Sequence, residues 1–402
     1  MTNNKQILEG SHAVAETIKA IAPAVVSAYP ITPQTHIVED LAQMKAAGEA
    51  NFEFVRAESE FAAASIVAGA AATGVRVYTS TSSQGLLLMT EVIFNIAGMR
   101  LPVVMTCANR GVSAPITIWN DHQDVMTIRD AGWILLFAEN HQEAVEQHLL
   151  AYKIAEKMKL PVMVNIDGFV LTHTYESVVV PTREQVLKYL PDYIPEQGTY
   201  LDPANPITLG AFATPAHYFE IREGLHNDLL ACKKILNDEY TKLKKAIPEI
   251  IKKPEADAIA NNGLLEYYGT RNPQTILIAL GSLVGTIKDV VDEINGKNNK
   301  LGPSENSIGV LKIKAFRPFP ADEVVQIIAN AKYVAVVEKA VSLGASDGPL
   351  AAEIKAAANG KIKTDIKGFV VGLGGRDITR EMIKKIIKDV GSKDNKMKFV
   401  GR

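Results

Sequence analysis

Short hydrophobic runs alternate with longer amphipathic stretches up to about residue 167. The runs are rich in residues that favour strands, and the longer stretches have helical spacing. The predicted strands are Ala24–Ser27, Phe52–Val55, Val75–Thr79, Val103–Cys107, Trp133–Phe137 and Val162–Ile166. The predicted helices are Gln34–Ala47, Ser59–Thr73, Gly85–Met99 and Gln142–Met158. This alternation is typical of an α/β fold with a parallel sheet covered by helices on both faces.

A second alternating region follows a polar, lysine-rich helical stretch, Asn227–Lys253. Its predicted strands are Thr275–Ser282, Ser307–Phe316, Tyr333–Ala340 and Ile366–Gly374. We therefore expect a first domain of residues 1–250, a linker at 251–263 and a smaller α/β domain of residues 264–402. The proline-spaced segment 201–224 is interpreted as an excursion from the first domain.

Charge and hydropathy give no support for several classes of partner. The 402 residues include 43 Lys plus Arg and 45 Asp plus Glu, a net charge of −2. So small a net charge does not favour nucleic acid or an anionic membrane as a partner. No apolar run reaches the roughly 18 residues that span a bilayer. The first residues lack the layout of a signal peptide, so we expect a cytoplasmic protein.

The side chains that commonly hold metals form no motif in this sequence. The two cysteines, Cys107 and Cys232, cannot supply the four thiolates of a typical iron–sulfur cluster, so none is expected in this chain. Asp121, His122 and Asp124 are too close in sequence to converge readily on one ion. We therefore predict no metal ligands. The scattered histidines are assigned no role: His12, His141, His148, His173, His217 and His226.

Thr32 lies between two prolines in the stretch VVSAYPITPQTHIVEDL. A hydroxyl residue followed by Pro33 predicts a helix N-cap and first helical position. The preceding apolar run places Thr32 at the carboxyl end of a strand, where open α/β sheets bind ligands. A helix N-terminus there would favour an anion such as a carboxylate. Two interpretations stay open, a simple cap and a contact to an anionic ligand.

Glu58 and Glu60 begin an alanine-rich helical stretch that Gly74 is expected to end. Negative charge is favoured at a helix start, so both residues are compatible with ordinary first-turn acids. However, the residues from Phe61 to Thr73 carry no charge. A carboxylate facing such a surface would be partly desolvated, which raises its pKa and suits it to share a proton with a ring nitrogen.

Six segments, in this order, resemble the α subunits of the 2-oxoacid:ferredoxin oxidoreductases, most closely those of the pyruvate type. They are YPITPQT, ESEFAAASIVAGAAATG, TSTSSQGLLLMTEV, NRGVSAPITIWNDHQDVMTIRDAGW, FRPFP and GLGGRDIT. Together they span nearly the whole chain.

The resemblance implies a thiamine diphosphate enzyme whose active site is divided among subunits. This chain would supply a pyrimidine-binding domain and a transketolase C-terminal-like domain. A β subunit would hold the diphosphate, Mg²⁺ and a 4Fe–4S cluster, and γ and δ subunits would complete a dimer of heteromers that reduces ferredoxin and acylates coenzyme A. The sequence agrees, because it lacks the Gly-Asp-Gly of the diphosphate motif; IDGF and SDGP come nearest.

The same resemblance assigns the site residues. Glu60 matches the glutamate that hydrogen-bonds the cofactor's aminopyrimidine at N1′. Thr32 and Arg110 match the residues beside the substrate carboxylate, for which a planar, permanently charged arginine is well suited. The remaining cofactor contacts are assigned to Pro30, Ile31 and Ser83.

Pyruvate is the expected substrate, although relatives that use branched 2-oxoacids share the NR and SAPI motifs of the segment NRGVSAPITIWND. Alternatives are therefore an α subunit for 2-oxoisovalerate or 2-oxoglutarate, or a non-catalytic structural subunit. Joint retention of Thr32, Glu60 and Arg110 argues against the last. A Rossmann dinucleotide protein is rejected, since AYPITPQT stands where the glycine fingerprint would follow the first strand.

Four other motifs are given structural interpretations. Thr79–Gly85 is open to cofactor or substrate contact, but a hydroxyl turn and cap are favoured for most of its members. In WNDHQD we expect Asp121 to cap a helix and Trp119 to lie at an interface. Arg317 is expected to brace domain packing, and Gly372–Asp377 to form a tight turn at a domain contact.

Overall fold

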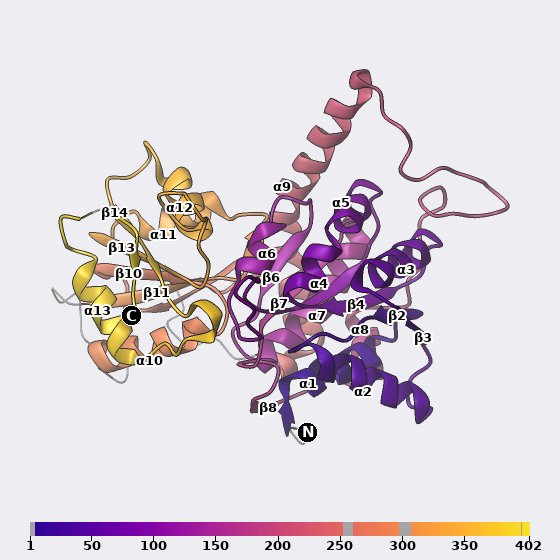
Figure 1. Cartoon of the computed structure of the whole chain (residues 1–402), viewed down its shortest axis with the longest axis horizontal. Helices are drawn as coiled ribbons and strands as arrows, with labels where there is room; N and C mark the ends of the chain where they lie inside the picture. The colour runs from indigo at the N-terminus through magenta and orange to yellow at the C-terminus, as the bar shows by residue number, and fades with distance from the viewer. Residues whose placement is uncertain (1–4, 252–259, 297–306, 395) are drawn as a thin grey trace.

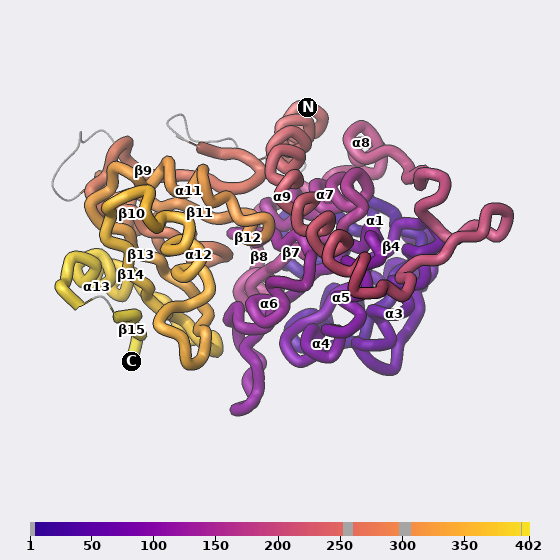
Figure 2. The backbone as a smooth tube through the Cα atoms, turned by 90° about the horizontal axis from the view of Figure 1, so that it is seen from above, coloured from indigo at the N-terminus to yellow at the C-terminus, as the bar shows by residue number. Residues whose placement is uncertain are grey.

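The computed structural model describes residues 5–251, 260–296, 307–394 and 396–402. It shows two α/β bodies lying side by side, with the N-terminal body in indigo to magenta and the C-terminal body in orange to yellow (Figure 1). The two bodies also lie side by side when viewed from above (Figure 2). The predicted α/β fold class is confirmed.

The first body is built on a seven-stranded sheet of order β12-β6-β7-β5-β4-β2-β3. All six predicted strands are present, each displaced by at most two residues. They are β2 (Val25–Ala28), β3 (Glu53–Arg56), β4 (Val77–Thr81), β5 (Val104–Asn109), β6 (Ile134–Phe137) and β7 (Val162–Asp167). These six strands pair in parallel, and β12 (Ala315–Arg317) adds an antiparallel edge.

Helices cover both faces of this sheet, as predicted. The chain passes from β2 to β3 in one direction along the sheet and returns from β3 to β4, so right-handed crossovers place their helices on opposite faces. One layer contains α1 (Gly10–Ile21), α2 (Thr35–Ala46) and α7 (His141–Met158). The other contains α3 (Glu60–Ala72), α4 (Ser83–Leu88), α5 (Thr90–Gly98) and α6 (Gln123–Thr127).

Two predicted helix boundaries in this body are wrong. The stretch Gly85–Met99 is two helices, α4 and α5, which meet at Met89. Thr32 does not cap α2, because the cap residue is Gln34 and Thr32 lies in the preceding turn. The Gln34 amide donates to Ser80 O at 3.0 Å, and the Gln34 N–H closes the turn on Ile31 O at 2.8 Å. This anchoring of Gln34 delays the helix start.

The long helix α9 (Pro215–Ala246) begins twelve residues before the predicted start at Asn227, after Thr214 (227 − 215 = 12). Its first part therefore occupies the end of the segment interpreted as an excursion. The helix projects from the first body (Figure 1). A short helix, α8 (Arg183–Tyr189), precedes it. None of the described helices combines the length and apolar character that a bilayer crossing needs.

The second body contains a six-stranded sheet of order β15-β14-β13-β10-β11-β9. Its strands are β9 (Leu265–Gly269), β10 (Thr275–Ala279), β11 (Ile308–Ile313), β13 (Tyr333–Glu338), β14 (Asp365–Val370) and β15 (Lys398–Phe399). Among these described strands, β9 alone pairs in the antiparallel sense. The helices are α10 (Leu283–Asn295), α11 (Ala321–Ile328), α12 (Pro349–Ala358) and α13 (Arg380–Asp389).

The predicted strand Ser307–Phe316 is wrong as one strand, because it divides between the two sheets. The chain leaves β11, and the backbone N–H groups of Lys314 and Ala315 both donate to Leu264 O. It then pairs with β6 as β12, so the C-terminal chain completes the first sheet. The proposed linker at 251–263 stays a prediction, since residues 252–259 lie outside the described residues.

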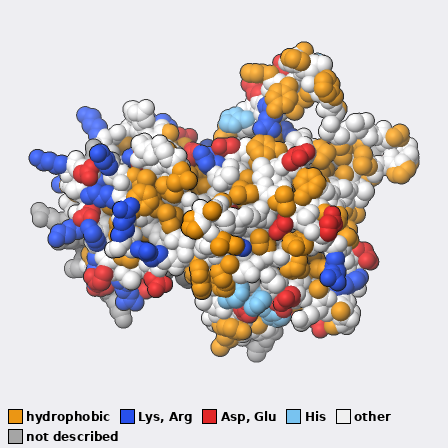
Figure 3. All heavy atoms as spheres, viewed as in Figure 1, with side chains coloured by type: hydrophobic (Ala, Val, Ile, Leu, Met, Phe, Trp, Pro, Cys, Tyr) orange, Lys and Arg blue, Asp and Glu red, His pale blue; other side chains and the backbone are white. Residues whose placement is uncertain are grey.

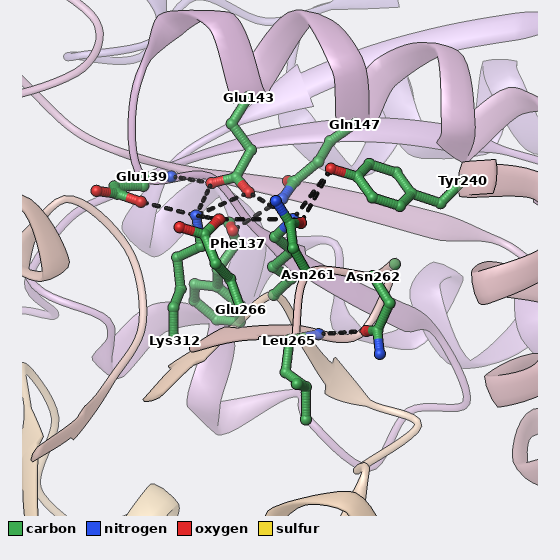
Figure 4. A network of polar contacts seen from close by, with 12 residues as sticks. Phe137, Glu139, Glu143, Gln147, Tyr240, Asn261, Asn262, Leu265, Glu266 and Lys312 are labelled. Atoms are coloured by element: carbon green, nitrogen blue, oxygen red, sulfur yellow. Dashed lines mark hydrogen bonds and ion pairs between the residues drawn. The ribbon is translucent and has the colours of Figure 1, made fainter. Parts of the chain in front are cut away.

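A buried ionic network joins the two bodies (Figure 4). Lys312 on β11 contacts Glu139 at 2.7 Å and Glu143 at 3.1 Å, both from the first body, and Glu266 of its own sheet at 2.9 Å. The Lys312 side chain is 4% exposed. Burial alone would raise the pKa of Glu266. The positive charges of the nearby lysines, of which Lys312 has the largest effect, instead hold this pKa well below its usual range.

We expect Lys312→Met to lower the free energy of unfolding by about 3–5 kcal/mol, because it removes the buried cation that three carboxylates share and leaves them, among the described residues, only the ion pairs with Lys288 and Lys314. Urea unfolding of the variant measures this loss. The control is Lys361→Met, which removes an exposed pair with Asp322 and is expected to cost less than about 1 kcal/mol. Equal stability of both variants would show that the network does not hold the two bodies together.

Candidate active site

The predicted site residues lie at one edge of the first sheet. The segments that follow β2, β4 and β5 carry Thr32, Ser83 and Arg110. Because these strands are parallel, their carboxyl ends meet at the same edge, where open α/β sheets bind ligands.

Glu60 is the first residue of α3 and its side chain lies inside the protein. Ser59 is the N-cap, and its hydroxyl accepts the Ala62 N–H at 3.2 Å. Glu60 is only 8% exposed and has no hydrogen-bond or ion-pair partner within the described part of the chain. The predicted helix window and its stop at Gly74 (φ 84°) are confirmed.

The space for the Glu60 carboxyl depends on Gly85. A Cβ at Gly85 would stand 2.8 Å from Glu60 Oε1 and 2.5 Å from Thr81 Oγ1. Helix α4 therefore approaches the carboxyl closely because residue 85 has no side chain.

Three unpaired hydroxyls lie on or just after β4, and that of Thr81 is next to Gly85, as the Glu60 carboxyl is. Thr79 Oγ1, Thr81 Oγ1 and Ser82 Oγ are buried and have no hydrogen-bond partner among the described residues. Buried polar groups are normally paired. An acid and several hydroxyls without partners indicate a place for a polar ligand.

Arg110 and Thr32 are in direct contact. The Arg110 guanidinium donates from Nη1 to Thr32 O at 2.9 Å and from Nε to Thr117 O at 2.6 Å. Arg110 is 7% exposed, and no carboxylate lies within ion-pair distance of its guanidinium among the described residues. Burial lowers the pKa of Arg110, while Asp124 opposes this effect. A mostly buried cation of this kind suits an incoming carboxylate.

Asp124 holds the loops of the site in place, a role that the sequence did not predict. Its Oδ2 accepts the backbone N–H groups of Ser83 at 3.1 Å and Arg110 at 2.9 Å, and its Oδ1 accepts the Asn109 amide at 3.1 Å. Burial raises the pKa of Asp124 to about 6. An acidic residue at the start of a short helix is the only sequence signal, and it does not specify partners on two other strands.

The other predicted cofactor contacts differ in exposure. Pro30 is exposed, and Ile31 is half-buried with its N–H donating to Gln34 Oε1 at 3.2 Å. Ser83 is buried at φ 47°, and its hydroxyl donates to Gly111 O at 2.6 Å. Their roles toward a cofactor stay predictions.

The acidic and histidine side chains of WNDHQD point to different partners. Asp121 accepts the N–H of Gln123 and of Gly374, both at 3.0 Å, and His122 Nε2 contacts Asp167 at 2.6 Å. His122, not Asp121, is the N-cap residue of α6, although Asp121 accepts the first helical N–H as a capping side chain does.

The second body closes one side of this edge. A Cβ at Gly375 would stand 2.4 Å from Trp119 Cβ, and Lys339 Nζ lies 2.7 Å from Asp167 Oδ2. Arg317 joins Asp130 at 3.0 Å and Glu353 at 2.6 Å across the two bodies. The predicted turn at a domain contact and the bracing role of Arg317 are confirmed.

Comparison with known proteins identifies two family domains. Residues 16–241 match the domain described as "Pyruvate flavodoxin/ferredoxin oxidoreductase, thiamine diP-bdg", and residues 274–383 match "Pyruvate:ferredoxin oxidoreductase core domain II".

Similar proteins cover nearly the whole chain. The pyruvate synthase subunit PorA of Methanosarcina barkeri is 45% identical over 95% of this chain and 92% of its own length. The ketoisovalerate oxidoreductase subunit VorA of Pyrococcus horikoshii is 38% identical over 96% of this chain and 93% of its own length. A solved 2-oxoglutarate:ferredoxin oxidoreductase from Magnetococcus marinus has the same fold, with a TM-score of 0.68 and 21% identity. That alignment covers 96% of this chain but 65% of the solved chain. Similarity to the PorA subunits of pyruvate synthase and the match to the family domains show that the chain belongs to the 2-oxoacid:ferredoxin oxidoreductase family.

Proposed function

We propose that this chain is the α subunit of a pyruvate:ferredoxin oxidoreductase, which converts pyruvate and coenzyme A to acetyl-CoA and CO₂ while reducing ferredoxin. The observation that carries the proposal is that two buried charged residues, Glu60 and Arg110, follow strands of the same parallel sheet and have no oppositely charged partner among the described residues. The PorA relative supports pyruvate as the substrate.

The polar groups at Glu60 suit the aminopyrimidine of thiamine diphosphate, because a buried acid and a hydroxyl without a partner among the described residues can both bond to ring nitrogens. Glu60 and the Thr81 hydroxyl, which both lie next to Gly85, would hold the ring through hydrogen bonds. When bound, the cofactor supplies an electron sink for decarboxylation of a 2-oxoacid. The Glu60 carboxyl would exchange a proton with a ring nitrogen of the bound cofactor, beside helix α4 and the end of β4.

Arg110 and Thr32 orient the substrate in this proposal. The Arg110 guanidinium attracts the carboxylate of a 2-oxoacid, and its contacts to Thr32 O and Thr117 O fix the direction of the fork. The exposed Thr32 side chain lies beside it. Asp124 keeps Ser83 and Arg110 in register through their backbone N–H groups.

The remaining parts of the reaction are assigned to partner subunits. Mg²⁺, the diphosphate and the 4Fe–4S clusters are proposed to reside in β, γ and δ subunits within a dimer of heteromers. The two cysteines of this chain are buried, and burial raises the pKa of Cys107 well above its usual value and that of Cys232 to about 12. Neither is available as a surface thiolate. A cytoplasmic location remains part of the proposal.

Purification of the assembled complex from its native cell tests this function. Ferredoxin reduction is measured with pyruvate, 2-oxoisovalerate and 2-oxoglutarate at equal concentrations. The proposal expects the highest kcat/KM for pyruvate. Preference for 2-oxoisovalerate would instead favour the function named for the VorA relative, and absence of turnover with all three would favour a structural subunit.

We expect Gly85→Ala to lower kcat by at least about tenfold, because the added methyl would displace the Glu60 carboxyl. The fold should tolerate the change, since alanine favours a helix over glycine by up to about 1 kcal/mol. Gly69→Ala on α3 is the matched control, because its added Cβ would meet nothing within 4 Å among the described residues apart from its own stretch of helix. Unchanged turnover in Gly85→Ala would show that the position of the Glu60 carboxyl does not depend on a glycine at residue 85.

A further inference from the structure

Three side chains that can bind a metal lie close together in space although they are far apart in the sequence. Their donor atoms, from Glu9, His36 and His173, all lie within 4.8 Å of one another, and no other such group of three occurs among the described residues. Glu9 ends β1 (Gln6–Glu9), His36 lies in the first turn of α2, and His173 lies between β7 and β8 (Tyr175–Val178). Histidine and acidic side chains gather over α1 and the start of α2 in Figure 3.

The distances between the three donor atoms are close to the distances between ligand atoms around a bound metal ion. Glu9 Oε1 lies 2.6 Å from His36 Nδ1, and the rings of His36 and His173 are 4.4 Å apart between centroids and tilted by 33°. Ligands at about 2.0–2.1 Å around tetrahedral zinc lie about 3.4 Å apart. The three donor atoms, all within 4.8 Å of one another, are therefore close enough for adjustment of the side chains to bring them to one ion.

Hydrogen bonds hold the ligands in this arrangement. Strands β1 and β8 pair with Glu9 opposite Tyr175, which fixes the backbone on both sides of the group. His173 Nδ1 lies 2.7 Å from Thr172 Oγ1, and that hydroxyl also accepts the Phe169 N–H at 2.8 Å. Such a contact at Nδ1 leaves Nε2 for a metal and orients the ring, as outer partners of metal-bound histidines do.

An open groove borders two of the three residues, Glu9 and His36. It is lined by Ile7, Leu8, Glu9, His12, His36, Glu39, Asp40 and Tyr175. Three of these residues are acidic, and Asp40 also accepts from His12 at 3.0 Å. The negative charge favours entry of a cation.

We propose that Glu9, His36 and His173 bind a divalent transition metal, with zinc the best match to two imidazoles and one carboxylate. A water occupies the fourth position. The ion fastens β1, the start of α2 and the β7–β8 connection to one another.

This metal also stabilises the turn that carries Thr32. His36 follows Thr32 by four residues at the start of α2 (36 − 32 = 4), and a Cβ at Gly168 would stand 2.6 Å from Pro33 Cγ. The ligand-bearing connection after β7 therefore packs directly against the Thr32–Pro33 turn. The proposal concerns the structure of this chain and does not depend on the substrate.

Calorimetric titration tests the site on the full-length chain without an affinity tag, after removal of metals with a chelator. The probe is ZnCl₂, and Co²⁺ absorbance reports the ligand geometry. We expect one zinc per chain with Kd of about 1 µM or lower, a tetrahedral Co²⁺ spectrum, and an unfolding midpoint that rises with zinc concentration.

Variants distinguish this site from surface binding. His173→Ala and Glu9→Gln are each expected to weaken zinc binding at least about tenfold. His226→Ala, an exposed histidine on α9, is the control and should bind as the unmodified chain does. Equal affinity in His173→Ala and His226→Ala would overturn the site, as would failure of the unmodified chain to bind zinc below about 100 µM. The three residues would then form only a hydrogen-bonded pair with a stacked ring.

Discussion

Glu60→Gln is expected to lower kcat of the assembled complex by at least about a hundredfold, while the subunits still copurify. The amide is nearly isosteric with the acid, so packing against Gly85 is retained. It cannot hold and release a carboxyl proton, and a positioned acid or base contributes about 10²–10⁴-fold to rate. Steady-state reduction of ferredoxin by pyruvate measures the loss.

The matched control is Glu58→Gln, two residues earlier in the same segment. Glu58 is exposed, whereas Glu60 is buried, so this change removes the same charge from the start of α3 without touching the pocket. We expect activity close to that of the unmodified complex. If Glu60→Gln turned over at a comparable rate, Glu60 would have no part in the chemistry.

Arg110→Lys is expected to raise KM for the 2-oxoacid at least about tenfold, with little change in KM for coenzyme A. Lysine keeps the positive charge but loses the planar fork that contacts Thr32 O and Thr117 O. A hydrogen bond to a charged group is worth about 1.5–3 kcal/mol, which is consistent with such a loss. Initial rates over a range of pyruvate concentrations measure the effect.

Arg100→Lys is the control for this change, since Arg100 makes a partly exposed ion pair with Asp228 at 2.8 Å. Lysine can replace it there at little cost. A rise in KM for coenzyme A equal to that for pyruvate would place Arg110 outside the carboxylate site.

The sequence predicted the first body well because its periodicity depends on local burial. Each predicted strand from Ala24 to Ile166 lies within two residues of an observed one. The position of Thr32 was less accessible to prediction. A Thr-Pro pair is typical of a helix start, but the helix begins at Thr35 because Gln34 is tied to Ser80 in the core. That contact joins the segment after β2 to β4, and the local sequence around Thr32 gives no sign of it.

The parts that could not be predicted depend on contacts distant in sequence. The residues that become β12 continue the hydrophobic run of β11, and only the three-dimensional structure shows that they pair with β6. Asp124 lies near Ser83 and Arg110 through the packing of α6, which no local pattern records. His173 similarly joins Glu9 and His36 through β1–β8 pairing.

A structure of the assembled complex with thiamine diphosphate tests the central claim most directly. The account predicts that a Glu60 carboxyl oxygen lies about 2.6–3.0 Å from a nitrogen of the aminopyrimidine ring. It also predicts that a partner subunit covers that side of the pocket and holds the diphosphate. A cofactor bound elsewhere, with Glu60 facing solvent or another side chain, would contradict the account.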